Sequence, residues 1–122
     1  MTPEEYKSIC DRPDVLVRGL IEASESVILT RDRDLAARLR KILDAPPVSK
    51  PSLHTGGTHN DHFHIKIDLD AAKKIVEHLI DAEAGAVGNN GETTPEASRI
   101  SALVNVWTEY IEYRRGRDES GL

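Results

Sequence analysis

The sequence predicts a domain of the α+β class that is predominantly α, with about five helices and a single strand or small hairpin between helices three and four. Apolar residues recur at spacings of three and four over most of the 122 residues, which is the period of helices with one buried face. Strict alternation of apolar and polar residues is clear only at residues 62–69. No internal repeat is visible, and a chain of this length can bury a core without disulfides.

The first helix is predicted at the N-terminus, where Thr2 can cap it and Pro3 takes the first helical position. It should end before Pro13, because the residue preceding a proline is pushed out of helical geometry. A second, longer helix then begins, and the run 30–34 can cap a third. Their inward faces are predicted to contain Leu16, Val17, Leu20, Ile21, Ser24, Val27 and Ile28 in the second helix, and Leu35, Leu39, Ile42 and Leu43 in the third.

Residues 45–60 contain three prolines and two glycines and are predicted to form a loop. The alternating residues 62–68 follow as a strand. A lone strand cannot satisfy its own backbone groups, so its partner should be the proline-rich stretch Val48–Leu53 or the same strand of a second copy. The free strand leads us to expect a homodimer, or a binding partner that adds a strand to this edge.

Two further helices are predicted after the strand. Asp70 can cap the fourth, and Gly85 or Gly88 can end it. Thr94 begins the fifth, and the polar residues 116–122 should fray as a tail beyond a single domain at 1–115. The apolar faces contain Ile75, Val76, Leu79 and Ile80, then Ile100, Leu103, Val104, Trp107, Tyr110 and Ile111; Leu20, Leu39, Ile65, Leu79 and Leu103 should meet in one core.

The composition narrows the classes of function. A net charge of -5 argues against a nucleic-acid partner, and no apolar run approaches the roughly 20 residues that cross a bilayer. We expect a cytoplasmic protein, because no secretory signal is visible and the one cysteine cannot form an internal disulfide. Cys10 should be a poor nucleophile, since the neighbouring acid Asp11 raises the pKa of a thiol.

Four of the five histidines lie within residues 54–64. On a strand His62 and His64 share one face, about 6.6 Å apart along the chain, and can converge on a metal ion. His59, or else His54 or Asp61, could supply a third ligand, and three ligands plus water is the pattern of catalytic zinc. The same histidines also suit metal-free acid–base chemistry, or simply the polar face of a half-buried strand.

Residues 56–68 resemble the first metal motif of the cupins, which is a glycine, five residues, His-x-His and then an acid. The chain departs from that motif, because Asp68 stands where the family has Glu and a helix is predicted where a further strand belongs. Cupins also need a barrel of many strands, for which the helical patterns leave no room. The resemblance is therefore limited to the local geometry of the two histidines.

Two other groups of side chains stand out. Basic residues gather around the third helix, but Asp32, Asp34 and Asp44 are interleaved with them, as is typical of a solvated face. In the fifth helix Trp107 is expected in the core, whereas Tyr110 and Tyr113, with their polar tips, are candidates for binding a partner. Lys66 joins them because it lies on the predicted free strand.

These observations predict a small cytoplasmic protein that binds another protein and does not catalyse a reaction. By size and charge alone it would suit an immunity, antitoxin-like or regulatory protein. The alternative is a metal-dependent enzyme that uses zinc or a similar divalent ion at His59, His62 and His64.

Overall fold

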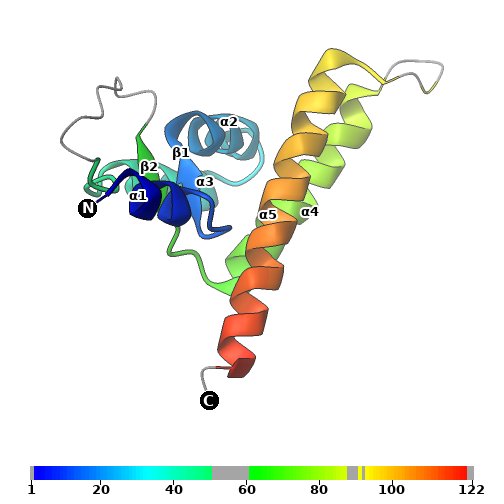
Figure 1. The fold of residues 1–122 in the computed structure, drawn as a ribbon. Coiled ribbons are helices and arrows are strands. Elements are labelled where there is room, and N and C mark those ends of the chain that lie inside the picture. Colours follow the sequence, from blue (N-terminus) through cyan, green and yellow to red (C-terminus); the bar gives the residue numbers. More distant parts are fainter. Residues whose placement is uncertain (1, 51–60, 88–90, 92, 121–122) are drawn as a thin grey trace.

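The computed structural model describes residues 2–50, 61–87, 91 and 93–120, with side chains as far as 117. These residues form five helices and two short strands, which confirms the predominantly α class and the strand between the third and fourth helices. The elements are α1 Pro3–Cys10, β1 Val15–Val17, α2 Arg18–Leu29, α3 Arg33–Leu43, β2 His62–His64, α4 Leu69–Ala86 and α5 Pro95–Ser120. In Figure 1 the antiparallel pair α4 and α5 stands beside a smaller group made by the other elements.

Local chemistry sets the starts of four helices. Thr2, Asp32 and Thr94 each accept a hydrogen bond from the amide three residues further on, at 3.0–3.1 Å, as expected for N-caps. The fourth helix begins earlier than predicted, because Asp68 caps it in place of Asp70. None of the described helices combines the length and apolar character needed to cross a bilayer.

The prediction of a helix at residues 15–17 was wrong. Val15, Leu16 and Val17 form β1, and α2 begins only at Arg18. Three consecutive apolar residues, two of them β-branched, suit a strand, although their spacing to Leu20 also fits a helical face. Pairing decides between the two, because β1 runs antiparallel to β2 with Leu16 opposite Phe63.

Partners within the chain lie on both sides of β2. Besides β1 on one side, the amide of Val48 donates to the carbonyl of His62 at 2.7 Å on the other. The predicted partners were the stretch Val48–Leu53 or a second copy of the strand, and β1 was not predicted as a partner. The expectation of a homodimer rested on a strand without any partner in its own chain, and β2 has such partners: β1 along one side and a single hydrogen bond on the other.

Beyond β2 the chain stays extended as far as Asp68, and a side chain replaces the missing strand partner. Tyr110 is fully buried, and its hydroxyl donates to the carbonyl of Ile67 at 2.5 Å and accepts from the Ile67 amide at 3.1 Å. Arg114 donates to the same carbonyl and to the same hydroxyl. Burial raises the pKa of Tyr110, which keeps the hydroxyl protonated as a donor. Tyr110, which was predicted to bind a partner, therefore lies inside the fold with its hydroxyl bonded to the chain itself.

The fifth helix also holds α2. Trp107 is fully buried, as predicted, and its indole N–H donates to the hydroxyl of Ser24 at 2.9 Å, which in turn donates to the carbonyl of Leu20 at 2.8 Å. Of the five residues predicted to meet in one core, four lie inside the large hydrophobic core: Leu39, Ile65, Leu79 and Leu103. The fifth, Leu20, is only partly buried and packs against the edge of this core.

Two surface predictions also differ from the structure. Ile80, expected inside, is 49% exposed on α4. Residues 116–120, expected to fray, continue α5 as far as Ser120. One contact supports this extension: the guanidinium of Arg117 lies 5.5 Å from the ring centre of Tyr113 and donates to its hydroxyl at 3.0 Å.

Tyr110→Phe tests the role of the hydroxyl. We expect it to lower the free energy of unfolding by about 1–3 kcal/mol, because the buried amide of Ile67 loses its acceptor. Tyr113→Phe on the same helix is the matched control and should cost less than about 0.5 kcal/mol, since that side chain is only partly buried and its hydroxyl bonds to the exposed Arg117. Urea unfolding of both variants measures the difference, and equal losses would contradict this role.

Candidate functional site

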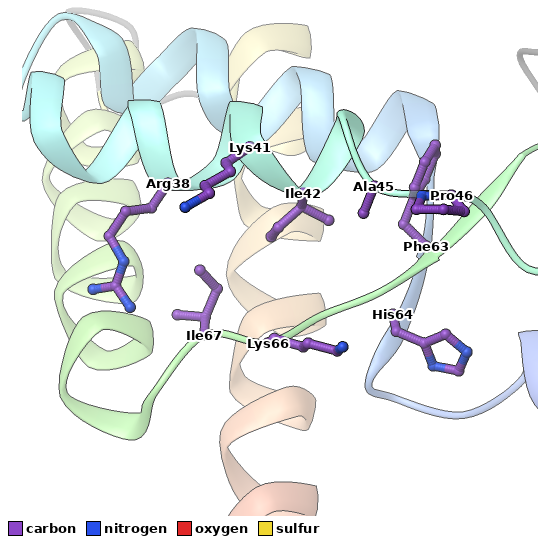
Figure 2. A pocket seen from close by; sticks show the side chains of 9 residues that line it. All are labelled: Arg38, Lys41, Ile42, Ala45, Pro46, Phe63, His64, Lys66 and Ile67. Atoms are coloured by element: carbon purple, nitrogen blue, oxygen red, sulfur yellow. The ribbon is translucent and has the colours of Figure 1, made fainter.

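A cavity of about 610 Å³ opens between α3 and the extended segment that contains β2 (Figure 2). Its volume falls within the range of about 300–1,000 Å³ that is usual for ligand sites. The walls come from opposite directions in Figure 2, with α3 and the turn after it on one side and residues 63–67 on the other. The lining residues are Arg38, Lys41, Ile42, Ala45, Pro46, Phe63, His64, Lys66 and Ile67.

The floor of the cavity is apolar. Phe63 and Ile67 are buried residues of the main core that also reach the cavity, and Ile42 is half-buried on the facing side of α3. Alternation places Phe63, Ile65 and Ile67 on the inward face of the extended segment. An apolar group that entered here would therefore meet side chains already held in place by the core.

The rim is basic. Arg38 and Lys41 are three residues apart on α3 and so share one face of that helix. His64 and Lys66 are two residues apart on the extended segment and so share one side of it. None of the nine lining residues is acidic, although the whole chain carries a net charge of -5. The cavity therefore gathers positive charge on an acidic protein.

One acidic residue next to the cavity, Asp68, forms an ion pair with Arg38 of the rim. Asp68 accepts from the guanidinium of Arg38 at 2.6 Å while its other carboxylate oxygen caps α4. The hydrogen bond from Arg38, followed by that from the amide of Ala71, lowers the pKa of Asp68. Both side chains are about half exposed, so the pair is weak and its partners can exchange. Arg38 is thus positioned at the rim with donors left for a ligand.

Of the predicted metal ligands, His62, His64 and Asp61 lie in the described part of the chain, and Asp61 forms an ion pair with Lys50 at 2.8 Å; His54 and His59 lie outside it. His64 lines the cavity, whereas His62 is half-buried with its ring edge-on to Tyr6, at 6.2 Å between centres. Among the described residues, no three His, Cys, Asp or Glu side chains come together as a metal site would require.

The predicted partner-binding residues separate in the structure. Lys66 is exposed at the cavity, Tyr113 is half-buried beside Arg117, and Tyr110 is in the core. Arg38 and Lys41 were not predicted as site residues, because the basic side chains of α3 were interpreted as a solvated helix face. Their spacing of three on one helix face was the signal available for finding them.

Cys10 is half-buried at the end of α1. Burial is the largest cause that raises the pKa of its thiol, and the charge of Asp11 raises it further. The nearby hydroxyl of Tyr6 lowers the pKa of the thiol in turn, and burial raises the pKa of that tyrosine to about 12. A thiol with a raised pKa supports the prediction that Cys10 is a poor nucleophile.

Comparisons with models of protein families, with curated proteins and with solved structures found no match to this chain.

Elemental analysis of the untagged, dialysed protein tests the metal site. Because no third ligand joins His62 and His64 among the described residues, we expect zinc well below one ion per chain, and equally little in His62→Ala/His64→Ala. A stoichiometric ion in the natural protein would instead support the metal-dependent alternative. That ion should be lost in the double variant and below about pH 6, where imidazole takes up a proton.

The acid limb of the stability curve tests the contact between Arg38 and Asp68. A carboxylate whose pKa is lowered on folding contributes stability above its unfolded pKa, and this contribution disappears as the pH falls through the folded pKa. Asp68→Asn keeps a capping oxygen but removes the charge. We expect its melting temperature to lie slightly below that of the natural protein at pH 6 and to converge with it below about pH 4. A constant difference at all pH values would contradict this assignment.

Proposed function

We propose that this chain is a non-catalytic binding protein that holds an acidic segment of another protein in the cavity between α3 and residues 63–67. The observation that carries the proposal is the lining, which combines an apolar floor with a basic rim and contains no acid. Protein interfaces typically have an apolar centre surrounded by polar groups. A segment with an apolar side chain flanked by carboxylates complements both parts of this site.

The individual side chains favour carboxylates. Arg38 presents a planar group that can donate two parallel hydrogen bonds to one carboxylate, and Lys41 and Lys66 add compact positive charges. No ion pair of either lysine is seen among the described residues. Arg38 and Lys41 come from one wall of the cavity and Lys66 from the other (Figure 2), so a carboxylate bound between them meets positive charge from both walls.

The lining also supports a binding role over catalysis. It contains no serine, threonine, cysteine or acid, and the only groups left for acid–base or nucleophilic chemistry are those of His64, Lys41 and Lys66. The metal-dependent alternative needs ligands from outside the described residues, and the metal analysis above tests it.

Charge favours a different protein as the partner. A second copy that paired at the same segment would bring the basic side chains of His64 and Lys66 in the two copies together, so we propose a different protein, and not a second copy, as the natural partner. The untagged chain should then sediment as a monomer. The cytoplasmic location expected from the composition stays a prediction.

Charge reversal tests the proposal with a defined probe, a short fluorescent peptide in which one leucine is flanked by valines and glutamates. Lys41→Glu with Lys66→Glu should weaken its binding by at least about tenfold, because two of the three permanent positive charges of the rim are inverted. Arg33→Glu with Lys73→Glu is the matched control, since both residues are exposed and lie outside the lining. Fluorescence anisotropy at fixed salt measures all three proteins.

A gain of binding provides an independent check. Asp68→Asn frees the guanidinium of Arg38 from its internal partner, so the acidic peptide should bind more tightly than it binds the natural protein. Equal losses in the cavity pair and in the control pair would mean that only overall charge matters. That result, or no binding of the acidic peptide to the natural protein, would overturn the proposed site.

A further inference from the structure

We infer that the bound segment is extended and adds a strand to the backbone of residues 64–66. This inference rests on the proposed function, because it specifies the conformation in which an acidic segment occupies the same cavity. It depends on a separate observation, namely an edge of the extended segment that remains open beside the cavity.

The register of the two strands shows which backbone groups point toward β1. The amide of Arg18 donates to the carbonyl of Asp61, and the amide of Ile65 donates to the carbonyl of Asp14, each at 2.8 Å. In an antiparallel pair these bonds flank residues that are not hydrogen-bonded to each other, which here are Val17 with His62 and Val15 with His64. The backbone groups of His62 and His64 therefore face away from β1.

Prolines leave most of that second edge unpaired. The amide of Val48 donates to the carbonyl of His62, but Pro47 and Pro46, which precede Val48, have no N–H to continue the pairing. Pro46 instead lies at the cavity together with His64. Across the described ranges, no hydrogen bond to the backbone of His64 or Lys66 is seen on this side. We call these two residues the open edge.

The open edge and the cavity form one site. Lys66 and His64 line the cavity, and α3 lies across from them in Figure 2, so the edge faces a space and not another strand. A strand laid along it would take its backbone bonds from these two residues, as in known cases of strand addition. Its alternate side chains would point in opposite directions, one set toward Ile42 and Ile67 and the other toward solvent.

Charge complementarity identifies the occupant. An extended segment of another protein with one apolar residue between acids would place the apolar side chain on the floor and bring its carboxylates to Arg38, Lys41 and Lys66. Because backbone bonds supply part of the affinity, a short segment with few charges suffices.

Backbone methylation of the peptide tests this conformation directly. The leucine-centred acidic peptide is made in two further forms, with N-methyl groups on one set of alternate residues or on the other set. Both forms keep every side chain and charge. A strand on the open edge predicts that one form loses at least about tenfold in affinity while the other changes by less than about threefold. Equal effects of the two methylation patterns would overturn the inference and leave the proposed function standing.

Two variants test the same contact from the side of the protein. Lys66→Pro removes the amide and the charge, whereas Lys66→Ala removes only the charge, so the proline variant should bind the peptide more weakly than the alanine variant. In the natural protein, the amides of His64 and Lys66 should gain hydrogen-exchange protection when the peptide binds. If Lys66→Pro does not fold, the methylated peptides and the exchange measurement still decide the question.

The remaining outcomes separate the alternatives. Failure of the unmethylated peptide to bind the natural protein would overturn this inference together with the proposed function. Self-association that rises with concentration and is lost in Lys66→Pro but not in Lys66→Ala would identify a second copy as the occupant, and would overturn the assignment to a different protein.

Discussion

The hydroxyl of Tyr110 satisfies both backbone groups of Ile67, and the geometry of the cavity depends on this contact. The chain leaves the sheet after His64 but remains buried at Ile65 and Ile67, so its amides and carbonyls still need partners. A third strand would normally supply them. Here one phenol on α5, assisted by Arg114, fixes the segment in an extended form without covering its other edge. That uncovered edge presents His64 and Lys66 to the cavity.

The helix α5 also contacts α2, on the side of the molecule that leads to the other wall of the cavity. Trp107 lies one turn before Tyr110 and bonds to Ser24 of α2, and α2 packs against α3. Buried Leu39 holds α3 to the core, so that its outward residues Arg38 and Lys41 stand at a fixed distance from the extended segment. Both walls are therefore supported before a ligand arrives, which lowers the entropic cost of binding.

Features that depend on residues close together in the sequence were predicted, whereas features that depend on contacts between distant residues were not. The caps at Thr2 and Thr94 depend on residues three positions away, and they were found. Leu16 was assigned to a helix from its spacing to nearby apolar residues, since nothing near it in the sequence reveals its strand partner Phe63. Tyr110 was predicted at an interface because of its polar tip, whose partner is a backbone group 43 residues away in sequence. Of the cavity residues, His64 was predicted as a metal ligand and Lys66 as a residue of an unpaired strand. No sequence pattern shows that Arg38 lies across a cavity from them.

The contrast between overall and local charge favours a particular partner. A net charge of -5 repels long polyanions as they approach, because their charges act together over a large surface. At physiological salt, however, fields between exposed charges fade over about 8 Å, so a segment that reaches the cavity experiences mainly its basic rim. A short acidic segment with an apolar centre benefits from the rim, the floor and the open edge together. A nucleic acid could use the rim with its phosphates, but it has no peptide backbone that could pair as a strand with the open edge at His64 and Lys66.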